Sequence, residues 1–341
     1  MAGQPERIAL AYQPTGFQPR GGLQRLALNL VEHLRGSGAV VQVLVTRGRG
    51  HGLEVRWPDL PASRHLAGVD ALVILGCDQP WAYALAVTQR LRRPGLAVHW
   101  LPSFHDPRSV AHPLRARLAG RALKVMQHLG IQVHVQTEHE RSLLAAGACH
   151  LSSHALGSDL RRRLQLALPP EPDDDRPLDL LFVGRPTIQK GWPRFLRLAA
   201  RSGLRCAAVV PSVPEGERAA AEAAGVTLVH NPDDPTLLAM LRQARLVTIP
   251  ADYESFGLAQ LEALSQGCLV PVLGHWPLWQ GFAELQWQEC SGEQIANACR
   301  ALCRNDPERR RLVSLQLAHL RCHPILATPF LPGVSRTRPH G

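Results

Sequence analysis

Short apolar runs alternate with longer segments of helical spacing along most of the chain. In the first half, the apolar runs are residues 8–12, 40–46, 71–75, 96–101 and 133–136. In the second half, they are residues 180–183, 205–210, 226–229, 246–249 and 268–272. Runs of this length between helical segments are typical of parallel strands that are covered on both faces. The pattern therefore predicts an α/β fold with two parallel sheets.

A polar, proline-rich segment at residues 169–177 separates the two series of strands. A chain of 341 residues is also long enough for two domains that each bury a core. We therefore expect an N-terminal domain at 1–168 and a C-terminal domain at 178–320, the latter ending in a helix over 304–320. Residues 321–341 contain four prolines and predict a tail that is poorly ordered or draped over the surface.

The composition is that of a soluble globular protein, with 45% hydrophobic and 19% charged residues. No secretory segment precedes the first strand, and prolines and glycines interrupt the longest uncharged stretch, so we expect a cytoplasmic protein without a membrane span. The net charge of +10 favours anionic partners. The eight cysteines form no paired CxxC framework and indicate reduced thiols, and the spacing of Cys299 and Cys303 argues against a zinc site.

Two glutamates mark the point where a predicted strand gives way to a helix. Pro250 ends the strand at 246–249, and residues 256–265 have the spacing of a buried helix. Glu254 stands at the entrance of this helix, and Glu262 lies about two turns further along among apolar neighbours. A carboxylate in such surroundings needs hydrogen-bond donors, which sugar hydroxyls supply. The pair therefore predicts a nucleotide-sugar site.

Two cations precede these glutamates at the end of another predicted strand. Gly184 and Arg185 follow the strand at 180–183, and Lys190 and Gly191 open the next helix. Helix amides already favour an anion at such a position. We expect both cations to bind a diphosphate and to replace a divalent metal on the leaving nucleotide, because charge-assisted hydrogen bonds contribute roughly 1.5–3 kcal/mol each. The alternative is that both are solvated loop residues.

With these motifs in this order, the chain resembles the retaining glycosyltransferases of the GT-B fold, family 4. That resemblance implies two Rossmann-like domains that face a central cleft, and it covers roughly residues 7–275. It implies transfer of a sugar from a nucleotide-diphosphate sugar to an acceptor hydroxyl with retention, in polysaccharide, lipopolysaccharide or glycolipid synthesis. It also implies a sugar or lipid-linked acceptor and no metal or other cofactor.

The resemblance assigns roles to individual residues. It places Glu254 on the transferred sugar, Glu262 on the nucleotide ribose, and a histidine, here His105, near the reacting carbon. The catalytic group is then His105, Arg185, Lys190 and Glu254. The donor-binding group is Gly21, Gly22, Gly184, Ser255, Phe256, Gly257, Leu258 and Glu262. Each has a structural alternative, such as a helix-entrance carboxylate for Glu254 and an ion pair for Glu262.

Other features leave the function less defined. Residues 108–128 predict a helix with a basic stripe beside an apolar one, which either contacts an anionic membrane at the inner face of the cell membrane or packs its apolar stripe in the core. Asp173 and Asp175 stand between prolines and are interpreted as solvated charge. After Pro271, the segment Gly274–Trp279 departs from the family pattern.

Alternative functions are a sugar phosphorylase or nucleotide-sugar epimerase of the same fold, or a non-catalytic sugar-nucleotide-binding subunit. No recognition motif supports a nucleic-acid partner.

Overall fold

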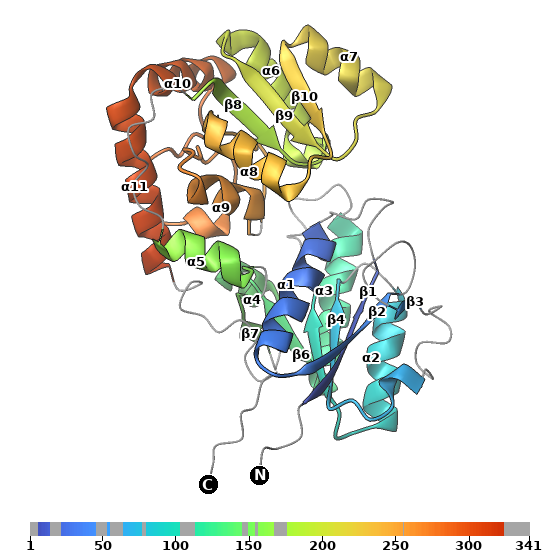
Figure 1. The fold of residues 1–341 in the computed structure, drawn as a ribbon. Coiled ribbons are helices and arrows are strands. Elements are labelled where there is room, and N and C mark those ends of the chain that lie inside the picture. The colour runs from blue at the N-terminus through green and yellow to red at the C-terminus, as the bar shows by residue number, and fades with distance from the viewer. Residues whose placement is uncertain are drawn as a thin grey trace. The chain divides into compact units, whose positions relative to one another are not determined.

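The computed structural model describes residues 6–13, 22–45, 53–54, 64–76, 80–102, 113–144, 149–153, 156–166, 176–254 and 256–323. The described chain forms two compact units, the first ending at Ser158 and the second beginning at Asp159 (Figure 1). The sequence assigns residues up to 168 to the first domain, whereas the structure groups helix α5 (Ser158–Leu166) mainly with the second unit. The predicted linker at 169–177 lies largely outside the described residues.

The first unit contains a seven-stranded parallel sheet of order β3-β2-β1-β4-β5-β6-β7. Its strands are β1 (Arg7–Tyr12), β2 (Val40–Val45), β3 (Leu53–Glu54), β4 (Ala71–Leu75), β5 (Ala97–Leu101), β6 (Gln132–Val135) and β7 (Cys149–Leu151). Five of these were predicted, while the two edge strands were missed because each has only two or three residues. The helices are α1 (Gly22–Gly36), η2 (Arg64–Leu66), α2 (Pro80–Arg92), α3 (Pro113–His128) and α4 (Glu138–Leu144).

The central strands of this sheet carry the core of the first unit. All five residues of β4 are buried, as expected for a strand covered on both faces. Trp100 on β5 is fully buried and lies with its ring centroid 4.6 Å from that of Tyr83 on α2. The Trp100 indole also donates a hydrogen bond of 2.7 Å to the carbonyl of Gly76. This aromatic contact fixes α2 against the sheet.

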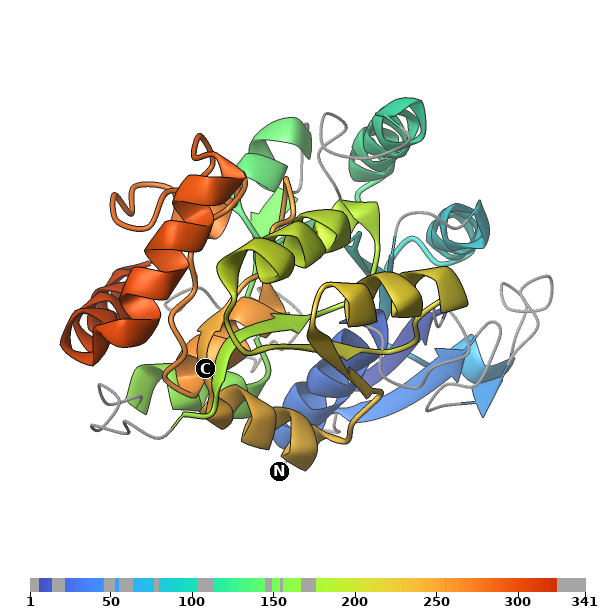
Figure 2. The ribbon, with the colours of Figure 1, turned by 90° about the horizontal axis from the view of Figure 1, so that it is seen from above.

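The second unit contains a four-stranded parallel sheet of order β10-β9-β8-β11. Its strands are β8 (Leu178–Val183), β9 (Cys206–Val210), β10 (Val226–His230) and β11 (Ala244–Val247). Its remaining elements are η3 (Ile188–Lys190), α6 (Trp192–Ser202), α7 (Glu215–Ala223), α8 (Asp234–Gln243), α9 (Leu258–Ser265), η4 (Pro277–Trp279), α10 (Gly292–Arg304) and α11 (Asp306–Cys322). Helices α6 and α7 lie side by side on one face of the sheet (Figure 2), and α8 lies on the other (Figure 1).

The fifth strand predicted for this sheet, at 268–272, is reduced to isolated bridges. Leu269 pairs with Leu246 of β11, and Val272 pairs with Gln286. Pro271 lies between these two bridges and has no N–H to donate to a ladder. The backbone therefore keeps the course of a strand without forming a continuous one.

The second unit ends in two helices, one of which was predicted. The helix predicted at 304–320 is confirmed as α11, which begins after the cap Asn305. Helix α10, which begins with a capping box between Ser291 and Gln294, precedes it and was not predicted. Helix α11 continues to Cys322, so the first residues of the predicted tail are helical. Residues 324–341 of the predicted tail lie outside the described residues.

Candidate active site

The loop after β8 carries the first predicted cation. The Gly184 amide donates to the Val209 carbonyl at 3.0 Å, which keeps this loop in line with β9. Arg185 follows and is exposed, and no hydrogen bond or ion pair holds its guanidinium among the described residues. Its side chain is therefore available to a ligand at the carboxyl end of the sheet.

The short helix η3 positions the second cation. Its cap Thr187 accepts a hydrogen bond from the Lys190 amide, and Gly191 closes the turn with φ of 73°. Helix α6 starts directly afterwards, with a proline in its first turn. Lys190 consequently stands at the entrance of a helix, as the sequence predicts.

Lys190 and Glu254 form an ion pair between Nζ and Oε1, although they are 64 positions apart in the chain. The Glu254 side chain is 11% exposed and that of Lys190 is 26% exposed. Strand β11 brings Glu254 here because it pairs in parallel with β8, and the Thr248 amide extends this pairing to the Leu181 carbonyl at 2.9 Å. Two motifs of the sequence thus meet at one edge of the second sheet.

The backbones of these two loops are in direct contact. A Cβ atom on Gly191 would lie 1.9 Å from the carbonyl oxygen of Pro250. Only glycine therefore permits this approach, which fixes the spacing between Lys190 and Glu254. The sequence predicted a role for Gly191 in opening the helix but not this contact.

Helix α9 follows the second loop. Gly257 caps it with φ of 67° and ψ of 50°, a left-handed conformation that favours glycine. Phe256 is buried and Leu258 half-buried, and the first amides of such a helix have no intrahelical acceptor. Glu262 is 8% exposed in the second turn, in keeping with the predicted buried carboxylate.

Gln260 is a buried residue of this helix that the sequence did not single out. It is 1% exposed, and a Cβ on Gly257 would lie 2.4 Å from its Oε1. The same oxygen accepts a hydrogen bond of 3.4 Å from the Trp279 indole. The Gln260 side chain therefore packs against the Gly257 turn and links it to Trp279. An amide within an apolar helix gives no signal of this in the sequence.

The segment Gly274–Trp279, which departs from the expected motif, packs against the loop that carries Glu254. The His275 amide donates to the Asp252 carbonyl at 2.7 Å, and the Trp276 indole donates to the Ala251 carbonyl at 3.2 Å. A Cβ on Gly274 would lie 1.9 Å from that same Ala251 oxygen. Both Trp276 and Trp279 are buried. This segment therefore supplies buried side chains and hydrogen bonds that hold the Glu254 loop in place.

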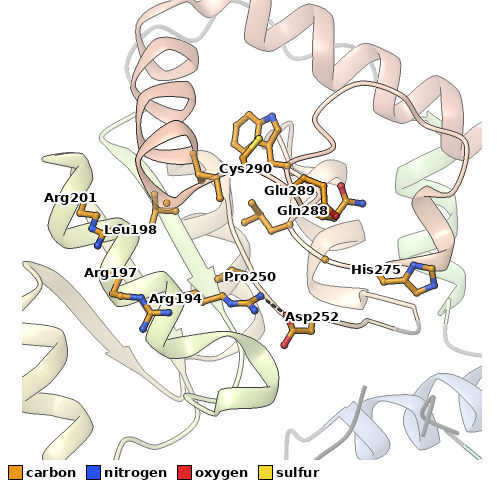
Figure 3. Close-up of a pocket in the computed structure, with 15 residues that line it drawn as sticks. Arg194, Arg197, Leu198, Arg201, Pro250, Asp252, His275, Gln288, Glu289 and Cys290 are labelled. Atoms are coloured by element: carbon orange, nitrogen blue, oxygen red, sulfur yellow. Dashed lines mark ion pairs between the residues drawn. The ribbon is translucent and has the colours of Figure 1, made fainter. Parts of the chain in front are cut away.

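A cavity of about 690 Å³ opens beside this loop. Asp252 lies on its wall and forms an ion pair of 2.5 Å with Arg194 of α6 (Figure 3). None of Arg185, Lys190, Glu254 and Glu262 is among its lining residues. The cavity and the predicted donor site therefore share a loop but use different side chains.

Several predicted residues are not part of this arrangement. Gly21, His105 and Ser255 lie outside the described residues, as do Asp173 and Asp175. Gly22 begins α1 of the first unit.

The described residues contain no cluster of three or more metal-ligating side chains. Burial raises the pKa of the Cys303 thiol to about 12 and that of Cys299 still further, so both are protonated thiols. No described helix has the length and apolar character needed to cross a bilayer.

No protein-family profile and no curated protein matches the chain by sequence. Solved structures do match it. A sucrose-phosphate synthase from Thermosynechococcus elongatus has a TM-score of 0.67 at 16% identity, over 93% of this chain and 94% of that one. The fold is GT-B.

Two further GT-B structures match at similar coverage. An alpha-glucosyltransferase solved with UDP and a 13-mer DNA containing an HMU base has a TM-score of 0.63 at 11% identity, over 94% of this chain and 96% of that one. An alpha,alpha-trehalose 6-phosphate synthase from Burkholderia multivorans has a TM-score of 0.62 at 13% identity, over 93% of both chains. The similarity thus extends over nearly the whole length of the chain, and the predicted fold class is confirmed.

Proposed function

We propose that this GT-B protein is a glycosyltransferase that moves a sugar from a nucleotide-diphosphate sugar to an acceptor hydroxyl with retention. The observation that supports this most strongly is the contact between Lys190 and Glu254. In open α/β sheets, ligands bind beyond the carboxyl ends of the strands. A cation from the loop after β8 and a carboxylate from the loop after β11 meet at that edge of the second sheet. The cation suits the diphosphate of a donor, and the carboxylate accepts hydrogen bonds from the hydroxyls of its sugar.

Arg185, Lys190 and the first amides of α9 bind the diphosphate in this proposal. Arg185 is exposed and has no partner among the described residues, so no existing ion pair has to break before it binds phosphate. These donors act where charge develops on the departing nucleotide, which is where electrostatic stabilisation accelerates a reaction most. They take the place of a metal ion, so transfer does not require one.

Transfer breaks the bond between the anomeric carbon and the phosphate oxygen and forms a bond to the acceptor oxygen. The acceptor's proton passes to the departing phosphate oxygen. The acceptor oxygen therefore binds on the face of the sugar that the phosphate leaves, and the product keeps the donor's configuration. Glu254 leaves Lys190 to accept hydrogen bonds from the sugar hydroxyls, and Glu262 holds the ribose. His105 contacts the sugar near the reacting carbon, and Gly21 and Gly22 approach the donor phosphates or the acceptor.

Uridine diphosphate sugars are the first donors to examine, because the alpha-glucosyltransferase of similar fold was solved with UDP. The acceptor is a free sugar or a lipid-linked sugar of a polysaccharide, lipopolysaccharide or glycolipid. Since that glucosyltransferase was solved with DNA and the present chain carries a net charge of +10, DNA belongs in the acceptor screen as a competing outcome.

Product analysis tests the proposal. Donor is supplied with and without acceptor and in the presence of a metal chelator, and the product's anomeric configuration is read by NMR. We expect acceptor-dependent release of nucleoside diphosphate and a product with the configuration of the donor. Consumption of inorganic phosphate indicates a phosphorylase, and donor isomerisation without acceptor indicates an epimerase. Binding of donor without turnover indicates a non-catalytic subunit. An inverted product contradicts retention.

Helix α3 supports a further part of the proposal, contact with an anionic membrane. The four apolar residues of its predicted stripe are exposed, so the alternative in which they pack in the core is wrong. They are Leu114 at 70%, Leu118 at 55%, Val125 at 54% and Leu129 at 39%. The helix instead packs through Leu123 and Met126, which are buried.

The basic residues Arg117, Arg121 and His128 are exposed next to this apolar stripe. A face that is apolar along one side and basic along the other matches the interface of an anionic membrane. We propose that this face holds the protein at the cytoplasmic surface of the cell membrane, where a lipid-linked acceptor is found.

A further inference from the structure

Three arginines of α6 line the cavity beside the Glu254 loop (Figure 3). Arg194, Arg197 and Arg201 follow one another at helical spacing and therefore share a face of the helix. Four residues of helix span about 6 Å, so Arg197 and Arg201 are spaced to hold one tetrahedral anion between them. Arg194 lies one turn closer to the loop.

The arginines differ in how they are neutralised. Asp252 neutralises Arg194 through their ion pair of 2.5 Å. No hydrogen bond or ion pair holds the guanidinium of Arg197 or Arg201 among the described residues, and both are exposed. The remaining acidic side chain of the lining is Glu289. The end of the cavity near Arg197 and Arg201 is therefore positively charged.

The rest of the lining suits a polyhydroxylated group. Gln288 and Glu289 supply an amide and a carboxylate, which accept hydrogen bonds from hydroxyls, and they lie across the cavity from α6 (Figure 3). Trp287, Leu198 and Leu273 supply aromatic and apolar surface. Aromatic faces beside hydrogen-bonding side chains suit a sugar ring, which has both C–H and O–H groups.

We propose that this cavity is a binding site for a sugar phosphate, distinct from the site of sugar transfer. The phosphate binds to Arg197 and Arg201, and the sugar ring lies against Trp287 with its hydroxyls on Gln288 and Glu289. The volume of about 690 Å³ accommodates a molecule of this size. The proposed transfer site in the second unit uses four side chains that do not line the cavity, namely those of Arg185, Lys190, Glu254 and Glu262. The sugar phosphate and the nucleotide sugar therefore bind at the same time. This proposal does not rest on the proposed transfer reaction.

Calorimetric titration of the full-length protein tests the proposal. The probes are a hexose 6-phosphate, the same hexose without phosphate, and inorganic phosphate. We expect the hexose 6-phosphate to bind more tightly than inorganic phosphate, and the unphosphorylated hexose not to bind. The double variant Arg197→Ala/Arg201→Ala should weaken binding of the hexose 6-phosphate at least tenfold. Because both side chains are exposed and unpartnered, the variant should unfold at the wild-type temperature.

Arg218→Ala is the matched control, since Arg218 lies in the same unit, has a side chain that is 41% exposed and pairs only weakly, at 3.7 Å, with Glu215. It should bind like the wild type. A second titration with a nucleoside diphosphate already bound checks that the sites are distinct. The proposal is overturned if the wild type does not bind the hexose 6-phosphate, if the double variant binds it equally well, or if the nucleoside diphosphate competes with it. None of these results requires turnover.

Discussion

Gly191 contacts Pro250 so closely that a Cβ on the glycine would lie 1.9 Å from the proline carbonyl oxygen. This contact joins the loop that carries Lys190 to the loop that carries Glu254, and the glycine's φ of 73° allows it. An alanine at 191 is penalised twice, by its backbone conformation and by collision with a backbone atom. The left-handed conformation alone costs about 1–2 kcal/mol.

Gly191→Ala should therefore reduce the free energy of unfolding by clearly more than about 2 kcal/mol, which is the upper limit of the conformational cost alone. Urea unfolding of the second unit measures it. Gly203→Ala is the matched control, because Gly203 also has a left-handed φ, of 63°, at the other end of α6 but nothing within 4 Å of its would-be Cβ. Equal losses in the two variants would show that the contact with Pro250 has no energetic role.

The meeting of Lys190 and Glu254 was predictable because it follows from general rules. Both residues lie in the loops that follow apolar runs, and parallel strands place their carboxyl ends at one edge of a sheet. The alternation of strands and helices likewise predicted the sheets without knowledge of any side-chain contact. The edge strand β7 was missed because three half-buried residues carry no periodic signal.

Contacts that depend on one atom's position were not predictable. Nothing in the sequence distinguishes Gln260 from an ordinary polar helix residue, yet it supports the Gly257 turn. From the sequence alone, the three arginines of α6 are indistinguishable from a solvated helix face. Only the structure places Gln288 and Glu289 across a cavity from them. Pro271 was included in a strand because the run around it is apolar, although its missing N–H breaks the ladder.

Lys190→Ala should lower the rate of sugar transfer by about 10²–10³-fold, the range typical of removing one donor that stabilises developing charge. Stability should fall by roughly 1–3 kcal/mol, because the Glu254 side chain is only 11% exposed and loses its partner. Steady-state kinetics and urea unfolding of the same preparation separate the two effects.

Arg194→Ala is the control for Lys190→Ala, since it removes a neighbouring cation whose ion pair involves Asp252 rather than Glu254. It should retain most of the transfer activity. A Lys190→Ala protein that transfers sugar at the wild-type rate refutes the assignment of Lys190 to the diphosphate.

His99 and Glu140 should give the first unit opposing dependences on pH. Burial, together with the nearby His150, lowers the pKa of His99 to about 4, and burial raises the pKa of Glu140 to about 7. Between pH 4 and 6.5, His99 binds a proton only when the chain unfolds, so its contribution to stability falls as the pH falls. Between pH 4.5 and 7, Glu140 loses its proton only on unfolding, so its contribution falls as the pH rises.

In the wild type these two trends offset each other from about pH 5 to 6.5. Glu140→Gln removes the second trend, so stability of the first unit should rise with pH across this window, by up to roughly 1.4 kcal/mol per pH step. His99→Asn should reverse the slope. Urea unfolding read from peptides of β5 and β6 by hydrogen exchange and mass spectrometry reports on this unit alone. If the free energy of unfolding changes with pH in the same way in both variants, His99 and Glu140 are not the groups that cause the pH dependence.

Membrane contact through α3 predicts a specific pattern of vesicle binding. Leu114→Asp/Leu118→Asp should abolish co-flotation with vesicles that contain phosphatidylglycerol, because it places charge where apolar side chains enter the interface. Arg117→Gln/Arg121→Gln should weaken binding to these vesicles about fivefold per arginine, and should leave any binding to pure phosphatidylcholine unchanged. Leu91→Asp/Leu166→Asp is the control, since Leu91 and Leu166 are 72% and 69% exposed on other helices. If this control loses binding as fully as the α3 variant, general surface apolarity rather than α3 holds the protein at the membrane.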